Sequence, residues 1–483
     1  ESPAMRMLMR KLRVDDYLGL VAASSVIRPG VARSGMMRTY IERHRFPDRR
    51  HEAHPILLQI MPETYGVMVY QEDVIKVANR FAGLDLGEAD VLRRGMSGKF
   101  RSRAEFQKAK QAFFDKAKEK GHPADMVTEV WRQVESFAGY AFAKGHSASF
   151  AVESYQSLFL KAHWPLEYMT ACINNFGGFY RTEFYVHEAR LLGGSIAAPC
   201  VNSGGYRTRY TGGTKTITLG FNLVKGVEGE TAATIERERS QNGPYHNIEG
   251  FVRRTGTGLE QLLTLIRIGA FRWASRSKQQ LQWEAHFLLG HLPKRSPTAD
   301  LFQEQDTTSA HHTLNALPQL SGGTEENAYD EIELLGFPLS SPFGLLTSNA
   351  KDQANAGIPA RALPEFIDRH VAIAGYLVTV KETSTIKGDR MLFGCFVDRE
   401  GLWIDTVHFP QVASAFPFRG RGVYLLNGTA KEEFGCVNVE VSSMEKLDLM
   451  PDPRYDESTP SKLRPSGSRH RKVPQARRLP NAS

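Results

Sequence analysis

The chain has 483 residues, of which 41% are hydrophobic and 24% charged, a composition typical of globular proteins with several domains. Its longest apolar run, Leu18 to Ile27, is shorter than the roughly 18 residues of a membrane-spanning helix, so the sequence argues against an integral membrane protein. The four cysteines are widely spaced, which argues against a zinc site or a disulfide framework and favours a cytoplasmic location.

The formal net charge of +8 is unevenly distributed. Residues 454–483 carry eight Lys or Arg against two acids, and most of the excess charge lies there. Residues 1–50 have a net charge of +6 and residues 93–120 a net charge of +7. Such clusters are typical of nucleic-acid binding, although a solvated helix face gives the same count. Because the chain starts at Glu1 without a methionine, we expect a fragment or a processed product.

Residues 1–176 are predicted to be mainly helical. Two sets of apolar residues have the spacing of a buried helical face. They are Val74, Val77, Ala78 and Phe81, then Ala151, Tyr155, Leu158, Phe159 and Ala162. Residues 184–285 predict smaller helical units with a short extended piece near Ile217, and residues 286–330 have the composition of a linker.

The last third of the chain changes character. Five β-rich runs are separated by Gly and Asp turns, at residues 371–380, 391–397, 402–409, 422–429 and 438–441. Five short strands with this spacing predict a small Greek-key barrel of the OB type. From Pro451 onward the sequence is rich in Pro, Ser and Arg, and we expect a disordered basic tail. The predicted fold class is therefore multidomain, with mainly α-helical regions followed by a small all-β barrel.

Two stretches place cations among glycines and small polar residues, Leu92–Lys99 and Phe137–Ala151. Such a composition suits phosphate groups, because Arg and Lys neutralise phosphate oxygens where Gly lets the backbone approach. Arg93 and Arg94 are adjacent, so on a helix they point about 100° apart. We expect one to meet phosphate and the other to pair with an acid or with a nucleic-acid backbone. A surface arginine pair is the alternative.

Lys144, His146 and Ser147 precede an apolar helical pattern, where the start of a helix offers free N–H groups to an anion. We expect Lys144 to meet phosphate and His146 to donate to it or to transfer a proton. The alternatives are that Ser147 only caps the helix and that His146 is partly buried.

The order of several motifs resembles the bacterial replicative DNA polymerase III alpha subunit (family C), over residues 1 to about 445. The motifs are Ile27–Gly30, Ser34–Met36, Thr64–Glu72, Ala89–Met96, Lys144–Ala148 and Tyr155–Glu167. The resemblance implies fingers at 1–176, a helix-hairpin-helix DNA-binding region at 177–285 and a linker at 286–335. An OB-fold domain at 336–450 and the disordered basic tail at 451–483 complete the predicted organisation.

The resemblance also implies roles for individual residues. It implies that dNTP phosphates are bound by Arg93, Arg94, Lys144, His146 and Ser147. It also implies that DNA is contacted by Arg28, Lys99, Lys225 and Gly226. Glu228 departs from the family pattern, which has Gly there, and its charge would repel phosphate. In the linker, the segment with Leu301 and Phe302 resembles the short peptide that binds the sliding clamp in this family, although Thr298 replaces the usual Gln. Candidates for single-stranded DNA on the barrel are Lys387, Arg390, Phe393 and Trp403.

The resemblance implies that Mg²⁺ serves the intact enzyme and is held by palm aspartates upstream of Glu1. We therefore expect no catalytic or metal-binding residue in this chain, and no polymerisation by it alone. The predicted function is part of a DNA-directed DNA polymerase that extends a primer with dNTPs, with other holoenzyme subunits as partners. The alternatives are a non-enzymatic nucleic-acid-binding protein that uses the hairpin and OB modules, or the error-prone lesion-bypass relative of the family.

Overall fold

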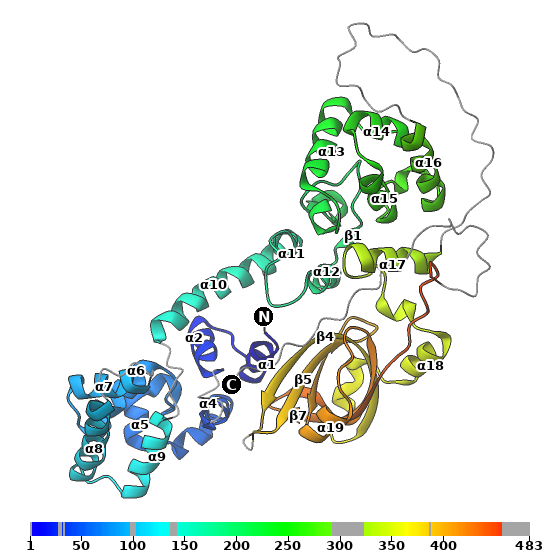
Figure 1. The fold of residues 1–483 in the computed structure, drawn as a ribbon. Helices are drawn as coiled ribbons and strands as arrows, with labels where there is room; N and C mark the ends of the chain where they lie inside the picture. Colours follow the sequence, from blue (N-terminus) through cyan, green and yellow to red (C-terminus); the bar gives the residue numbers. More distant parts are fainter. Residues whose placement is uncertain are drawn as a thin grey trace, which may run out of the picture.

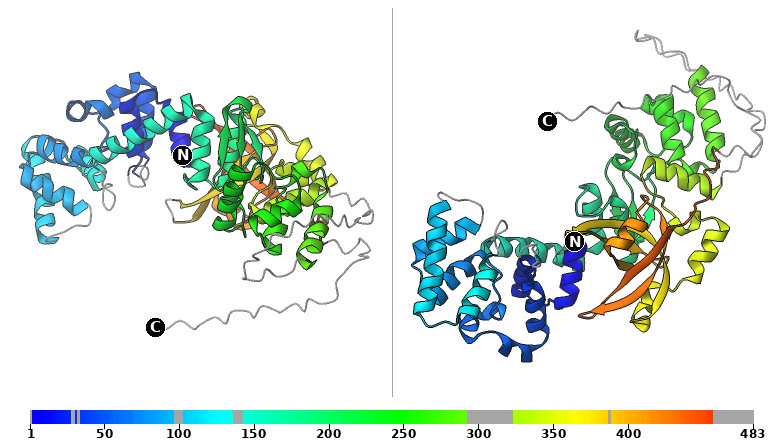
Figure 2. Two further views of the ribbon diagram at one scale, coloured as in Figure 1. Left: turned by 90° about the horizontal axis from the view of Figure 1, so that it is seen from above. Right: turned by 60° about the horizontal axis from the view of Figure 1, so that its bottom comes forward.

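The structure, a computed structural model, describes residues 2–27, 31, 34–96, 103–135, 143–291, 323–385 and 388–455. It contains two helical bodies and a β-barrel, and the long helix α10 (Lys144–His163) runs between the two helical bodies (Figure 1). The two further views keep the same arrangement, with the first helical body on one side of α10 and the other parts beyond its far end (Figure 2).

The first helical body is formed by residues before α10 and has one continuous apolar core. Its helices are α1 (Pro3–Leu12), α2 (Tyr17–Val26), α4 (Met36–Arg45), α5 (Pro55–Ile60), α6 (Gln71–Lys76), α7 (Leu86–Met96), α8 (Arg103–Glu119) and α9 (Ala124–Glu135). A π-helical turn, Val77–Ala82, continues α6. Val74, Val77, Ala78 and Phe81 are all buried, which confirms the helical face predicted there.

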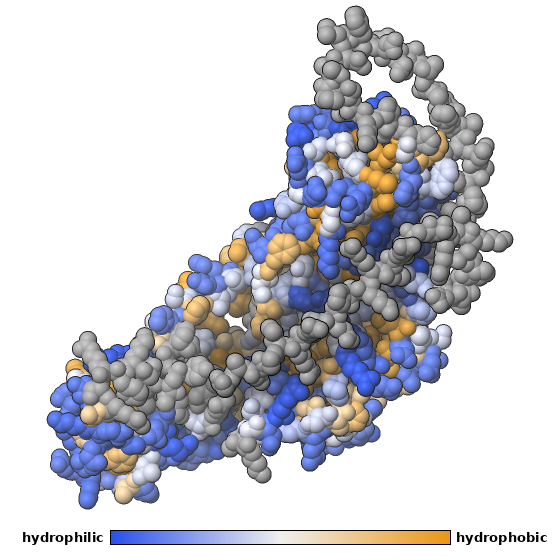
Figure 3. All heavy atoms as spheres, in the orientation of Figure 1, coloured by the Kyte–Doolittle hydropathy of each residue, from blue (hydrophilic) through white to orange (hydrophobic). Residues whose placement is uncertain are grey.

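The apolar face predicted on α10 is wrong. Ala151 is buried, but Tyr155, Leu158 and Phe159 are between 48% and 57% exposed. Helical spacing predicts which side chains share a face, whereas burial needs a second surface against that face. α10 leaves the first body after its first two turns, so its later apolar residues lie at the surface. Hydrophobic residues are visible between the two helical bodies in Figure 3.

The second helical body surrounds a small three-stranded sheet. Its helices are α11 (Pro165–Asn174), α12 (Thr182–Leu191), α13 (Gly229–Asn242), α14 (Ile248–Thr255), α15 (Leu259–Arg267), α16 (Lys278–His291) and α17 (Thr324–Leu334). The strands are β1 (Ser195–Ala197), β2 (Arg209–Thr211) and β3 (Thr216–Thr218), in the order β1-β3-β2. The extended piece predicted near Ile217 is thereby confirmed.

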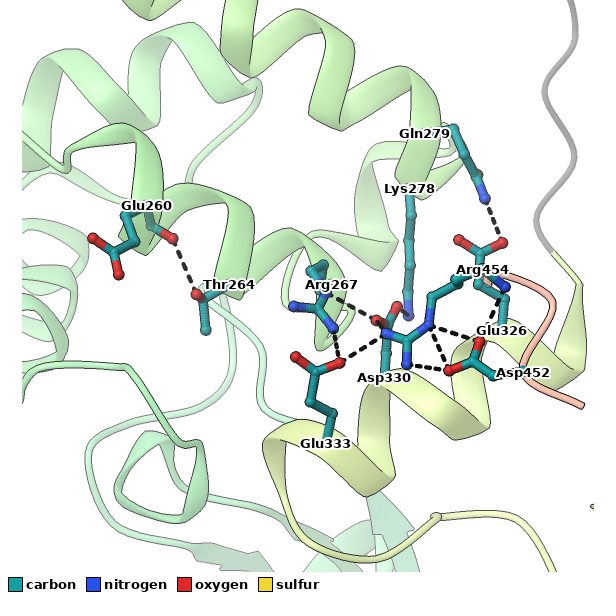
Figure 4. A network of polar contacts seen from close by, with 10 residues as sticks. All are labelled: Glu260, Thr264, Arg267, Lys278, Gln279, Glu326, Asp330, Glu333, Asp452 and Arg454. Carbon is teal, nitrogen blue, oxygen red and sulfur yellow. Dashed lines mark hydrogen bonds and ion pairs between the residues drawn. The ribbon is translucent and has the colours of Figure 1, made fainter. Parts of the chain in front are cut away.

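The segment predicted as a linker is helical at both described ends, which corrects that prediction: α16 extends to His291 and α17 covers Thr324–Leu334. Asp330 on α17 is 2% exposed and pairs with three cations (Figure 4). Its carboxylate lies 2.9 Å from Arg267 Nε, 3.3 Å from Lys278 Nζ and 2.8 Å from Arg454 Nη1. Long-range ion pairs therefore fix α17 against α15 and α16.

The same cluster corrects the expected start of the disordered tail. Residues 451–455 are described, and Arg454 bonds Asp452 as well as Asp330 and Glu333. Arginine can satisfy several carboxylates at once because its guanidinium presents five donors in a fixed plane. The chain after the barrel is thus attached to the second helical body as far as Tyr455.

The barrel confirms the predicted OB-type fold. Its strands are β4 (His370–Ser384), β5 (Arg390–Val397), β6 (Trp403–His408), β7 (Val423–Glu433) and β8 (Cys436–Lys446), closed in the order β4-β5-β6-β8-β7. The short helix α19 (Pro410–Ala415) connects β6 to β7, and α18 (Ser348–Ala356) precedes the barrel. Ile373, Phe396, Ile404 and Leu426 fill the interior and are fully buried.

Candidate nucleotide and nucleic-acid interface

Arg93 and Arg94 lie in the last turn of α7, and both pair with one carboxylate. Arg93 Nη2 is 2.7 Å from Asp90 Oδ1, and Arg94 Nε is 2.9 Å from Asp90 Oδ2. We expected one arginine to meet phosphate and the other to pair with an acid or the template backbone; both pair with Asp90 here, and the phosphate contact stays a prediction. Asp90 is three residues before Arg93 and four before Arg94, and both spacings bring side chains together on a helix.

The packing of α7 against α8 fixes the end of the helix that carries the arginines. Gly95 follows Arg94 and faces Phe106 so closely that an added Cβ would lie 2.2 Å from a ring carbon. A larger residue there would require the Phe106 ring to move. At the other end of α7, Glu88 accepts a bond from the Asp85 N–H and an ion pair from Lys116. The arginines are therefore presented by a helix held at both ends.

Lys144 begins α10, and an acidic residue orients this start. The Lys144 N–H donates to both carboxylate oxygens of Glu72, at 3.1 and 2.9 Å. Its ammonium group pairs with Glu63 and lies 5.2 Å from the centre of the Tyr70 ring. The hydrogen bond from Lys144 lowers the pKa of Glu63. Lys144 is thus anchored on the segment that leads into α6.

The segment that leads into α6 is held in place by the buried carboxylate of Asp73. Asp73 is 1% exposed, and its carboxylate accepts backbone N–H groups of Val69 and Tyr70 at 3.0 and 2.9 Å. Burial raises the pKa of Asp73. Because α6 packs against α7, the two arginines and Lys144 share one scaffold.

The structure contradicts both predictions for Ser147, as a phosphate contact and as the N-cap of α10. It is fully buried, and its hydroxyl lies 2.5 Å from the hydroxyl of Ser25 on α2. A side chain in that position joins two helices and does not meet a phosphate from solvent. The residue that caps α10 is Ala143, so Ser147 is not the cap either. His146, by contrast, lies exposed in the first turn of α10, as a phosphate contact would require.

The predicted DNA-binding turn of the second body uses part of its backbone internally. Gly226 has φ of +86°, as a tight glycine turn requires. The Lys225 N–H donates to the Leu334 carbonyl at 2.8 Å, and the Glu228 N–H donates to the Gln261 side chain at 3.1 Å. Two amides that could have held a DNA phosphate are therefore occupied. The Lys225 side chain is exposed and remains the cation of this turn.

Trp403, one of the barrel residues predicted to bind single-stranded DNA, is in contact with α1 of the first helical body. The guanidinium of Arg6 on α1 lies 4.0 Å from the centre of the Trp403 ring and 2.6 Å from Asp405. Arg390 pairs with Glu382 on the neighbouring strand at 2.9 Å. Arg28, Lys99, Leu301, Phe302 and Lys387 lie outside the described residues.

A hollow of about 360 Å³ beside Ser34–Met36 was not foreseen. It lies between α4, α5 and α9, and its lining includes the cations Arg43 and Arg132 together with the acids Glu52 and Glu129. Arg132 donates to the Ser34 carbonyl at 3.3 Å, and burial lowers the pKa of Arg43. The residues come from segments about 100 positions apart, so only the basic composition of residues 1–50 hinted at this site.

The described residues form no site that fits the Mg²⁺ implied by the family resemblance. Its His, Cys, Asp and Glu residues form no group of three or more placed to hold a metal ion. A two-metal site needs clustered carboxylates, so the described residues do not supply one. Among the described residues, no helix combines the length and apolar character required to cross a bilayer.

Comparison with known families agrees with the fold. Residues 1–121 match the bacterial DNA polymerase III alpha subunit finger domain. Residues 193–281 match a helix-hairpin-helix motif. The first match includes α7 with Arg93 and Arg94, and the second includes the turn at Lys225.

The similarity to curated proteins extends over most of the chain. DNA polymerase III subunit alpha of Treponema pallidum is 30% identical over 85% of this chain and 35% of its own length. The Aquifex aeolicus protein of the same name is 28% identical over 85% of this chain and 34% of its own length. Over most of its length the chain is thus similar to bacterial DNA polymerase III alpha subunits, and it spans about a third of the length of these relatives.

Proposed function

We propose that this chain is the fingers-to-barrel part of a replicative DNA-directed DNA polymerase, which adds dNTPs to a primer on a DNA template. The similarity to DNA polymerase III alpha subunits over 85% of the chain carries this proposal. The succession of a helical body, a hairpin region and an OB-type barrel supports it. Because the chain spans about a third of its relatives, the activity is proposed for the larger enzyme.

Within that enzyme, Arg93, Arg94, Lys144 and His146 are proposed to position the incoming triphosphate. Arg93 and Arg94 share Asp90, and Lys144 pairs with Glu63, so each cation has a partly exposed carboxylate partner. Triphosphate oxygens can replace such a partner because charged hydrogen bonds to phosphate are strong and directional. Cations there offset the charge that spreads over the phosphate oxygens as pyrophosphate leaves.

We also propose a metal site elsewhere in the enzyme, partners and a location for this chain. The carboxylates that hold Mg²⁺, which neutralises phosphate charge when bound, are proposed to lie in the remaining part of the enzyme. Lys225 is proposed as a contact to the DNA backbone, and Leu301 and Phe302 as a contact to the sliding clamp. We propose the cytoplasm as the location and other holoenzyme subunits as partners.

The surface of α10 supports a role inside a larger assembly. Six large apolar residues of this one helix are between 44% and 57% exposed: Phe150, Val152, Tyr155, Leu158, Phe159 and Leu160. Contiguous apolar surface of this kind is typical of a protein contact. In the proposed polymerase, the part that carries the catalytic carboxylates would cover this helix.

The test is dNTP use by a polymerase that contains this chain together with a palm domain of the same family. Arg93→Ala and Arg94→Ala are expected to raise the KM for dNTP about 10-fold or more, because each removes a charged hydrogen bond. Arg38→Ala is the matched control, since Arg38 is also a helical arginine paired with an acid, at 3.1 Å from Glu42. Equal dNTP use by all three variants would favour a non-enzymatic nucleic-acid-binding protein.

A further inference from the structure

The loop between α11 and α12 holds two aromatic rings at the surface. Phe176 is 62% exposed and Phe179 is 52% exposed. The next two residues attach this loop to the barrel: the Tyr180 ring lies 5.4 Å from the ring of Trp403, and Arg181 Nη2 donates to the Leu377 carbonyl at 3.3 Å. The ring of Phe179 is therefore held at a fixed position beside β4.

Phe179 borders a hollow of about 320 Å³ between this loop and the barrel. The other walls are Arg181, the β4 residues Leu377 to Val380, and Gly420 with Arg421 just before β7. The hollow thus combines one exposed aromatic face, a short stretch of strand and two arginines. It lies where two parts of the chain meet that are about 240 residues apart in sequence.

The charges around the hollow favour an anion. Burial and the nearby charge of Arg421 both lower the pKa of Arg181. Within the described residues the Nε of Arg181 has no hydrogen-bond partner, and its nearest carboxylate, Glu183, is 3.7 Å away. Burial raises the pKa of Glu183, the acid nearest to Arg181. An anion between the two guanidinium groups would relieve their repulsion and could accept hydrogen bonds from both.

The barrel face favoured by the sequence is less suitable. Arg6 covers Trp403 and bonds Asp405, so part of the surface formed by β6 is already in contact with α1. Single-stranded nucleic acid binds where exposed rings stack on bases beside cations that hold the backbone. Phe179 with Arg181 and Arg421 provides that combination.

We propose that this hollow binds single-stranded DNA, with one base stacked on Phe179 and a neighbouring phosphate held between Arg181 and Arg421. The site is outside the strand face that the sequence indicated, and it includes a loop that is not part of the barrel. The identity of the ligand rests on the proposed polymerase function, because a template ahead of a primer is single-stranded. The arrangement of the hollow does not depend on that function.

Binding of a fluorescent oligothymidylate of about 20 nucleotides to the full chain, followed by anisotropy, tests the proposal. Phe179→Ala is expected to weaken binding at least five-fold, as expected for the loss of one stacked base. Phe176→Ala is the matched control, because Phe176 is an exposed ring of the same loop that does not border the hollow. It is expected to change the affinity less than two-fold.

Salt dependence tests the phosphate contact separately from base stacking. Arg421→Ala is expected to reduce the slope of log K against log salt by about 0.7, the value for one lost phosphate contact on a single strand. Arg361→Ala should leave the slope unchanged, since Arg361 is exposed, does not line the hollow and pairs with Glu400 at 3.3 Å. Circular dichroism of each variant checks that it is folded.

The proposal is overturned if the wild-type chain does not bind the oligonucleotide, or if Phe179→Ala and Phe176→Ala bind it equally well. Cross-linking of an iodouracil oligonucleotide should identify the peptide containing Phe179, and a map that excludes it would also overturn the proposal. Failure of the polymerase function would give a different result, namely no dNTP incorporation by the palm-containing enzyme while binding still depends on Phe179.

Discussion

Large apolar side chains are buried in the barrel but exposed on helix α10. In the barrel, Phe396 and Leu426 are completely buried, because five strands close on themselves and enclose their own interior. On α10, Leu158 and Phe159 are about half exposed, because the helix runs between two bodies and contacts the first mainly near its start. The barrel is complete within this chain, whereas α10 presents a surface suited to a further contact.

The largest effect expected from this comparison is on stability. Leu426→Ala removes a fully buried side chain and should lower the free energy of unfolding of the barrel by about 2–5 kcal/mol. Leu158→Ala, the same change on α10, should cost less than about 1 kcal/mol because Leu158 is 52% exposed. Urea unfolding of the two variants measures both values. Equal losses would show that α10 is buried in solution.

A titratable group inside the barrel gives the next largest effect. Burial lowers the pKa of His408 to about 4, so the folded barrel holds this imidazole neutral. Between pH 6.5 and 4 the unfolded chain binds a proton that the folded chain does not. Stability is therefore fully present above about pH 6.5 and falls as the pH drops towards 4, by up to about 3 kcal/mol.

The variant His408→Gln removes this titration. Its free energy of unfolding should depend less on pH over the same interval, because glutamine carries no ionisable group. Thermal unfolding from pH 7 to pH 4, compared between wild type and variant, isolates the contribution of His408 from that of the carboxylates. Parallel pH profiles would show that His408 is not buried in solution.

Alanine substitutions at two helical glycines test the difference between the packed helix α7 and the exposed helix α10. Gly95→Ala in α7 places a Cβ 2.2 Å from Phe106 and should destabilise the first helical body by about 1–3 kcal/mol. Gly145→Ala in α10 meets nothing within 4 Å and should be neutral or stabilising by up to about 1 kcal/mol. Denaturant unfolding measures both. Similar effects would contradict the close contact between α7 and α8.

The smallest effect is expected at the arginine pair. Asp90→Ala removes both ion pairs of Arg93 and Arg94, yet it should cost less than about 1 kcal/mol because all three side chains are between 27% and 37% exposed. Chemical unfolding measures the change. A loss above about 2 kcal/mol would identify Asp90 as a structural anchor, and the arginines as parts of that anchor rather than phosphate contacts.

Local patterns were sufficient for several elements. The five β-rich runs predicted β4 to β8, because a β-rich composition and Gly or Asp turns are properties of each short segment. The buried face of residues 74–81 was also predicted, since its apolar spacing agrees with a helix that packs inside one body. The site was predicted less well. Lys144 begins α10 as expected, but its pairing with Glu63 links residues 81 positions apart.

Residue patterns alone predicted the helical first body, the five barrel strands, the family resemblance and the places where cations concentrate. The burial of Ser147 against Ser25, the contact of α1 with Trp403 and the hollow shared by Phe179 and Arg421 became known from the folded chain. Periodicity and turn chemistry act within a few residues. Burial and charge pairing depend on surfaces that come from distant parts of the chain.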